Sequence, residues 1–423
     1  MIFFNAFFRK LIIIVSIVIL FLIQIFSKSF ANLNFNGLPL LQFTLVLFSI
    51  LVFLFNQKLF SKLFNSHFWF ILFIFILYCT GITFYSLSEG RDFIRIIQDS
   101  EFIIDILFLF LSIYVASHLS FKVHKKILGF MYISMAVYFT IIISLGGMKI
   151  VQAFSPTIPG MYKEWPLFGE YPSHTDILLG SIFFITNIKL FQKFNFEKII
   201  SFLLFTVAFM AQKRFLLIQL IILALVYFKR ITAKTLFSGL LFLMFFLLLI
   251  QSLESAGIKN SKGSTISLRS IGITLSSTFV ENEAAAGVSY RKNIFNDFIN
   301  SIDSVSKFMI GQGFGHPLTK QINSSGLTTR SPHILIATIF GRIGLIGLIF
   351  YIYFFYTFAK LGYESFYSEK NKELKEFKLF LLACLLVYIV EAQINPTLEY
   401  THHSYIRYYI LGCLIGLNRT KLL

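Results

Sequence analysis

The sequence predicts an all-α membrane protein, a polytopic transmembrane bundle of about twelve helices with one large, partly helical loop on the outer side. Its composition is the first reason: of 423 residues, 57% are hydrophobic and only 13% are charged, and the mean hydropathy is +0.77. A soluble domain is not this apolar. The second reason is a series of apolar runs of roughly 17 to 25 residues, the length that crosses a bilayer as a helix. These runs are continuous rather than alternating, which favours helices over the strands of a barrel.

Twelve apolar runs are predicted to span the membrane, and none of the eight prolines lies in the middle of one. They cover residues 11–26, 38–56, 68–86, 102–118, 127–145, 176–190, 198–212, 214–228, 235–251, 333–358, 377–393 and 404–419. The first run could be a cleaved signal, because Arg9-Lys10 precedes it and Ser29-Phe30-Ala31 follows it. Its length and the eleven later runs favour a first transmembrane helix instead.

The chain is expected to form one structural domain with three parts. Residues 1–251 form an N-terminal membrane bundle of about nine helices, 252–332 form the large outer loop, and 333–423 form about three C-terminal membrane helices. Within the loop, apolar residues after Glu281 recur at helical spacing and predict an amphipathic helix. They are Ile294, Phe295, Phe298, Ile299 and Ile302.

The formal net charge of +17 reflects membrane topology rather than nucleic-acid binding. Cytoplasmic segments of membrane proteins are enriched in Lys and Arg. More than half of the 37 basic residues fall in inner segments when the N-terminus is placed in the cytoplasm. Both termini are therefore predicted to be cytoplasmic. The three cysteines, Cys79, Cys384 and Cys413, lie in apolar runs and show neither metal-ligand spacing nor a disulfide pattern.

Three residues on the predicted outer side are candidates for catalysis. Arg214 follows Lys213 in a tight outer turn, Arg291 lies in the loop helix, and His333 follows Ser331-Pro332 at a predicted helix start. Each has a simpler interpretation: a snorkelling arginine, a solvated charge and a packing or capping histidine. Together, two cations and an imidazole at one face indicate an anionic substrate, because a guanidinium suits phosphate and histidine suits general-base chemistry. In the first turn, His333 would also face free helix N–H groups.

Other polar residues are weaker candidates for substrate binding. Arg91 and Arg95 could form an accessory anion site, although an ion-pair cluster with Glu89 and Asp92 is the preferred interpretation. His174 could contact a sugar or cap the helix after it. Asp105 lies inside an apolar run and is a candidate proton or packing site. The first outer loop, 27–37, has no Asp or Glu, so a carboxylate-bound metal is not supported and no cofactor is expected.

Four motifs follow one another in the C-terminal half. They are Gln212-Lys213-Arg214-Phe215-Leu216-Leu217, Tyr290-Arg291, Gly311-Gln312-Gly313-Phe314-Gly315, and Ser331-Pro332-His333 with Gly341-Arg342-Ile343-Gly344-Leu345-Ile346-Gly347. Their order resembles the O-antigen polymerase and O-antigen ligase superfamily of bacterial inner-membrane glycosyltransferases, over roughly residues 170–420. The resemblance implies a metal-independent enzyme that acts at the periplasmic face on a glycan linked to undecaprenyl diphosphate. Arg214 and Arg291 would bind the diphosphate, and His333 would activate the acceptor hydroxyl.

Three functions stay open at this stage. The leading one is polymerisation of lipid-linked repeat units. The second is a ligase that transfers the finished chain to lipid A core; ligases commonly carry a polar residue directly after the histidine, whereas this chain has Ile334. The third is a flippase or exporter of lipid-linked sugars, which would line a central path with charged residues. Expected partners are the lipid-linked oligosaccharide and membrane lipid, with a chain-length regulator and a flippase alongside, and no nucleic acid.

Overall fold

The computed structural model describes residues 2–31, 34–35, 38–145, 148–158, 165–168, 174–187, 196–210, 216–227, 251–252, 254–255, 286–319, 331–332, 334–393 and 401–417. These residues are almost all helical, which confirms the all-α part of the predicted fold class. Within them, the strands are confined to two hairpins with two residues in each strand. β1 (Asn34–Phe35) pairs with β2 (Leu38–Pro39), and β3 (Thr157–Ile158) pairs with β4 (Trp165–Pro166).

Several helices are long and apolar enough to cross a membrane, which identifies a membrane protein. Five segments meet this condition: Phe7–Phe26 in α1 (Ile2–Ala31), α4 (Ser66–Ser88), Glu101–His118 over α6 (Glu101–Ile104) and α7 (Leu107–His118), Phe121–Ile142 in α8 (Phe121–Ser144), and α17 (Leu335–Tyr367). A sixth is formed if α2 (Leu40–Phe55) and α3 (Gln57–Leu63), which meet at 83°, count as one bent span. The count of twelve spans stays a prediction.

Shorter or more polar helices occupy most of the other predicted spans. They are α10 (His174–Asn187), α11 (Phe196–Met210), α12 (Leu216–Tyr227), α18 (Lys372–Ala392) and α19 (Thr401–Gly416). Residues 235–250 lie outside the described part of the chain. Helix α19 is the centre of the bundle: its residues 404–416 are all buried, and it packs against α1, α7, α17 and α18. Protein surrounds this helix, so it tolerates a charged residue such as Arg407 without exposing it to lipid.

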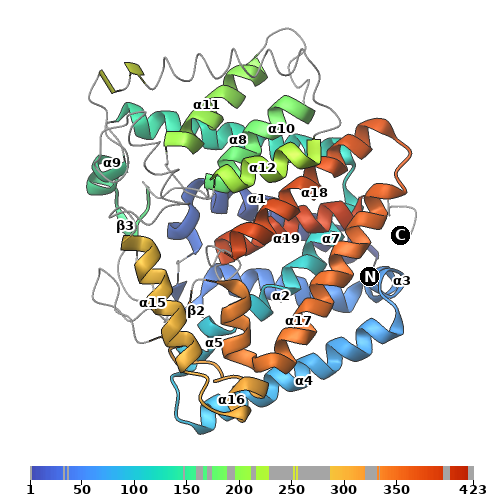
Figure 1. Cartoon of the computed structure of the whole chain (residues 1–423). Coiled ribbons are helices and arrows are strands. Elements are labelled where there is room, and N and C mark those ends of the chain that lie inside the picture. The colour runs from blue at the N-terminus through green and yellow to red at the C-terminus, as the bar shows by residue number, and fades with distance from the viewer. Residues whose placement is uncertain are drawn as a thin grey trace.

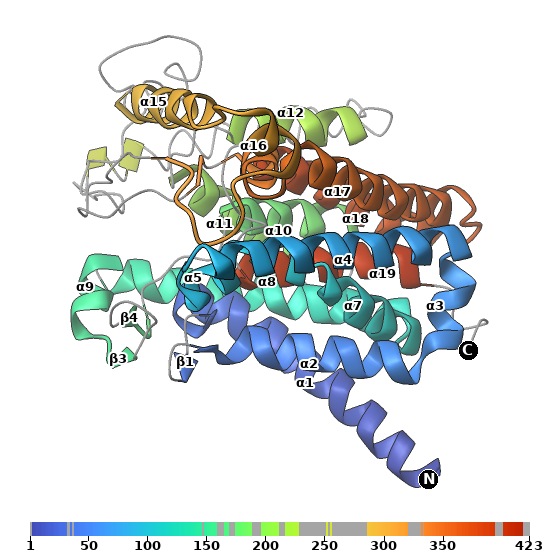
Figure 2. The same cartoon turned by 90° about the horizontal axis from the view of Figure 1, so that it is seen from below.

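The two ends of the bundle carry different elements (Figures 1 and 2). One end holds α5 (Phe93–Asp99), α9 (Met148–Phe154), α15 (Ala286–Asn300), α16 (Val305–Ile310) and both hairpins. The start of α1 and helix α3 lie at the opposite end. This separation agrees with the sequence, which assigns the N-terminus and the connection near residue 60 to one side of the membrane. That this side is the cytoplasmic one stays a prediction.

The predicted amphipathic helix of the large loop corresponds to α15, but its apolar residues do not share one buried face. Ile294 and Phe298 are buried, whereas Phe295 is 40% exposed and Ile299 is 49% exposed. Phe298 packs with Leu318 and Ala337, so a small separate core joins α15 to the start of α17. Helical spacing predicted the helix correctly. Which of its apolar residues are buried depends on the tertiary contacts.

A buried ion pair connects α17 and α18 at the end of the bundle that carries α3. The Lys378 ammonium group lies 3.0 Å from a Glu369 carboxylate oxygen and also donates to the Ser365 carbonyl and hydroxyl groups, each at 2.9 Å. Burial opposes ionisation of Glu369. The Asn371 N–H and the Lys378 ammonium group outweigh that effect and hold the pKa of this carboxyl below its usual value.

Acid should remove the contribution of Glu369 to stability. A lowered pKa in the folded state stabilises the protein above the unfolded-state value of about 4.3, and the effect disappears as the pH falls through the folded-state pKa. Thermal unfolding of detergent-solubilised protein should therefore show Glu369→Gln to be less stable than the wild type at pH 7, with the gap closing below about pH 4. A gap that is constant with pH would mean that the ionised carboxylate contributes nothing.

Candidate functional site

The structure describes only some of the predicted site residues. Lys213, Arg214 and His333 lie outside the described residues. Arg291 lies in the middle of α15 and His174 is the first residue of α10, in both cases without a described side chain. Helix α15 is at the end of the bundle opposite α3, where the sequence places all of these residues (Figures 1 and 2). Whether they meet around one substrate stays a prediction.

The predicted helix start at 331–333 is wrong. Helix α17 begins at Leu335, and Ile334 is its N-cap with extended backbone angles (φ −130°, ψ 116°). Ser331 does not cap this helix; its hydroxyl instead lies 3.3 Å from the Thr338 hydroxyl. The open N–H of Ile336 lies 3.5 Å from the side-chain oxygen of Gln393, at the end of α18, so a distant residue supplies the acceptor that a local serine was expected to give.

Arg95 and Arg91 have different surroundings. Arg95 Nε lies 3.9 Å from the Asp92 carboxylate, and both side chains are more than half exposed, as the ion-pair interpretation expects. Arg91 instead donates from Nη1 to the carbonyl oxygens of Gln312 and Phe314, at 2.6 and 2.9 Å. Arg91 therefore holds the glycine-rich turn 311–315 against the end of α4, a structural role that the sequence did not reveal.

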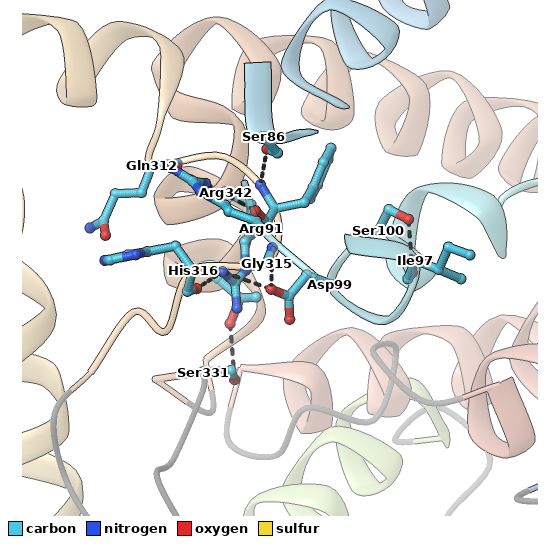
Figure 3. Close-up of polar contacts among 12 residues, drawn as sticks. Ser86, Arg91, Ile97, Asp99, Ser100, Gln312, Gly315, His316, Ser331 and Arg342 are labelled. Atoms are coloured by element: carbon cyan, nitrogen blue, oxygen red, sulfur yellow. Dashed lines mark hydrogen bonds and ion pairs between the residues drawn. The ribbon is translucent and has the colours of Figure 1, made fainter. Parts of the chain in front are cut away.

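A second arginine fixes the other side of this turn (Figure 3). The guanidinium of Arg342, only 1% exposed, lies 3.0 Å from the Asp99 carboxylate, which is 8% exposed. The same carboxylate accepts from the Gly315 N–H at 2.8 Å, and Arg342 also donates to the His316 carbonyl. The ion pair thus joins α5, the turn and α17 in one buried network. Buried charges persist only when they are paired and hydrogen-bonded in this way.

Helix α17 breaks at the point where the turn docks. Gly344 has φ 64° and ψ −171°, a conformation that is essentially restricted to glycine. The three carbonyl groups before the break accept hydrogen bonds from other elements: Gly341 from Gln312 N at 2.7 Å, Arg342 from Gly313 N at 3.0 Å, and Ile343 from the Tyr78 hydroxyl at 2.6 Å. The break in α17 is therefore a fixed kink whose carbonyl groups are hydrogen-bonded, rather than a flexible point in the helix.

Alanine at position 344 should destabilise the protein by about 2–4 kcal/mol, because it adds backbone strain and steric overlap. A Cβ there would overlap the Met309 carbonyl group, which is backbone and cannot move aside. Gly81→Ala is the matched control, since a Cβ at this helical glycine of α4 meets nothing within 4 Å. Thermal or denaturant-induced unfolding in detergent would compare the two. Equal stability of both variants would show that the break is not required.

Buried polar side chains form a layer across the bundle that the sequence only partly indicated. We call it the outer polar layer, because each member lies within two turns of the helix end predicted to face outward. Its contacts are Gln42 and Ser404 with Asp105, Arg407 with Glu391, Tyr388 with Asp176, and Gln219 with Thr175. These bonds connect α2, the junction between α6 and α7, α19, α18, α10 and α12 at one level of the bundle.

The charged members of this layer are bonded to neighbouring helices. Arg407 lies 2.6 Å from Glu391, with side chains 4% and 3% exposed, and its guanidinium stands 4.8 Å from the centre of the Tyr388 ring. The Tyr388 hydroxyl donates to Asp176 at 2.6 Å. Asp176, Glu391 and Arg407 are ionisable residues in apolar runs predicted to span the membrane, the same signal that singled out Asp105, and counting them in the sequence would have found the layer.

This layer fixes the start of α10, which carries the candidate His174, and the start of α12. Asp176 comes two residues after His174 on α10, and Gln219 comes five residues after Arg214 at the start of α12. Hydrogen bonds at 2.6 and 2.7 Å tie these two helix ends into the bundle. A site on the outer side would therefore stand on a rigid base, which precise chemistry requires.

Among the described residues, no group of three or more His, Cys, Asp or Glu side chains could hold a metal ion. The predicted independence from metal remains a matter for experiment. The sequence matches no protein family model and no curated protein. The resemblance to the O-antigen polymerase and ligase superfamily therefore rests on the motifs alone.

Proposed function

We propose that this protein is a metal-independent glycosyltransferase of the bacterial inner membrane, with both termini cytoplasmic. It polymerises undecaprenyl-diphosphate-linked repeat units into O-antigen or a related surface polysaccharide at the periplasmic face. One observation carries the proposal beyond the motifs. The glycine-rich turn, α15 with Arg291, and the break in α17 meet at the end of the bundle opposite α3, anchored by Arg91 and Arg342. The described segments that bear motifs thus belong to one assembly, whereas Arg214 and His333 lie outside the described residues and join it only in the proposal.

In the proposed reaction, a hydroxyl oxygen of the acceptor sugar attacks the anomeric carbon of the lipid-linked donor. The bond between that carbon and the phosphate oxygen breaks, the lipid diphosphate leaves, and the configuration inverts. Arg214 and Arg291 stabilise the negative charge on the leaving diphosphate, with Lys213 beside them. His333 takes the proton of the hydroxyl. Arg95 and His174 are the proposed contacts for the glycan, although the exposed pair of Arg95 with Asp92 also fits the ion-pair interpretation.

The ligase alternative shares this chemistry and differs only in the acceptor. The transport alternative requires charged residues that line a path through the bundle. In the described part of the chain, Asp105, Asp176, Glu391 and Arg407 are buried and bonded across helix pairs at one level. The other buried pairs described above, Arg342 with Asp99 and Lys378 with Glu369, also join separate segments. Charges arranged in this way hold helices together, which favours a transferase over a transporter.

A deletion strain tests the proposal most directly. The surface polysaccharide is separated on a gel, and lipid-linked intermediates from the same cells are analysed alongside. We expect lipid core that carries a single repeat unit, which identifies a polymerase. Bare core with long chains stranded on the lipid carrier would identify a ligase instead. Intermediates trapped on the cytoplasmic leaflet would identify a transporter and would overturn the arginine and histidine site.

A further inference from the structure

Helix α16 lies in the segment predicted to be an outer loop, yet much of its surface is apolar. Val305 is 80% exposed, Phe308 is 44% exposed and Ile310 is 43% exposed, so half of its six residues present apolar side chains outward. The Ser304 side chain caps its first turn by accepting from the Lys307 N–H, as expected for a regular helix with a defined start. Water is an unfavourable neighbour for such a surface.

The end of α16 lies well below the outer end of a neighbouring transmembrane helix. The Ile310 carbonyl is 3.4 Å from the Tyr78 hydroxyl, and Tyr78 lies ten residues before Ser88, where α4 ends. Ten residues of α-helix measure about 15 Å, half of a hydrocarbon core of about 30 Å. Even after allowing for the length of a tyrosine side chain, the end of α16 lies at the depth of the lipid chains.

The apolar surface of α16 continues the lipid-facing surface of the spans beside it. On α4, Phe73 is 58% exposed and Leu77 is 55% exposed. Helix α16 packs along the broken end of α17, where Phe308 lies edge-on against Phe340, and its last residue reaches α4 through the Tyr78 hydroxyl (Figure 1). An apolar patch flanked by transmembrane helices faces the same surroundings as those helices.

After α16 the chain returns through irregular backbone whose polar groups are bonded to protein, as is required inside a membrane. Residues 311–314 are buried, and each N–H from 311 to 315 has an acceptor: Lys307 O, Gly341 O, Arg342 O, Ser86 Oγ and Asp99 Oδ2, in that order. The carbonyl groups of Gln312 and Phe314 accept from Arg91. Irregular backbone occurs at membrane depth only where protein satisfies its polar groups, whereas an aqueous loop has no such need.

We infer that α16 and the turn Gly311–Gly315 form a re-entrant segment whose exposed side contacts the acyl chains of the outer lipid leaflet. The chain enters the bilayer after Asp303, reaches its deepest point near Ile310, and returns along the last turns of α4. Lys307, the charged residue of α16, points back to Asp303 with 2.8 Å between the charged atoms, so its charge stays near the entry. The inference goes beyond the proposed function, and only its assignment to the outer leaflet rests on the topology proposed there.

Tryptophan fluorescence of the full-length protein in lipid nanodiscs tests the segment. In a background with Trp69→Phe and Trp165→Phe, a single tryptophan is placed at position 308, which keeps an aromatic ring against Phe340. A second variant, Val305→Trp, changes a side chain that is already 80% exposed and leaves the packing unchanged. Lipids brominated on their acyl chains quench tryptophans that touch the hydrocarbon, and aqueous iodide quenches those that touch water.

Two control positions calibrate the measurement. Phe73→Trp on α4 reports the lipid-facing surface, and Lys370→Trp reports the exposed connection between α17 and α18. We expect Phe308→Trp and Val305→Trp to lose emission to brominated lipid as Phe73→Trp does and to resist iodide. Strong iodide quenching without quenching by brominated lipid, as for Lys370→Trp, would overturn the inference and leave this face to water or to a protein partner.

Discussion

Replacement of Arg291 by alanine should abolish polymer formation while the protein still inserts into the membrane. In the proposed reaction this arginine stabilises the leaving diphosphate, and loss of one such preorganised donor lowers rates by about 100-fold or more. Arg291→Lys should restore only part of the activity, because an ammonium group cannot make the two parallel bonds of a guanidinium. Polysaccharide gels and membrane-fraction immunoblots would measure product and insertion together. Arg214→Ala and His333→Ala should behave similarly.

Lys292→Ala is the matched control for Arg291→Ala. It removes a positive charge from the next residue of α15, and adjacent residues on a helix do not face the same way. We expect near-normal polymer in this variant. Normal polymer in Arg291→Ala would remove this residue from the site. Equal loss in both variants would mean that the general charge of α15 matters rather than a specific phosphate contact.

Replacement of Arg342 by methionine should destabilise the protein by about 3–5 kcal/mol, the usual result of removing one partner from a buried ion pair. The change leaves the Asp99 carboxylate, 8% exposed, with the Gly315 N–H but without its guanidinium. It also frees the turn that docks at the break in α17. The double variant with Asp99→Asn should recover much of the loss, because no unbalanced charge then remains.

Lys360→Met serves as the control for Arg342→Met. Lys360 also pairs with a carboxylate, that of Glu364 at 4.0 Å, but both side chains are more than half exposed. Exposed pairs of this kind contribute about 0–1 kcal/mol. Unfolding of the purified protein in mixed detergent would compare the variants. If Arg342→Met were no less stable than Lys360→Met, the network in Figure 3 would not be what holds the turn.

The network around Arg342 also shows how the candidate site depends on distant contacts. Arg91 and Gln312 are separated by 221 positions in the chain, and Asp99 and Gly315 by 216. The sequence identified Arg91 as a charge in an accessory anion site or an ion-pair cluster and the glycines as a motif. No local pattern connects the two, because side-chain hydrogen bonds between distant segments leave no periodic signal.

Hydropathy by itself determined the helical class, the membrane location and the approximate position of most helices, because burial in lipid and helical periodicity are properties of short segments. Tertiary structure decided three further features. Helix α17 begins at Leu335, where Gln393 lies near the Ile336 N–H. The same helix breaks at Gly344, where the turn docks, and Asp105, Glu391 and Arg407 belong to one buried layer. In each case a polar group without a local partner found one elsewhere in the fold, as buried polar groups must.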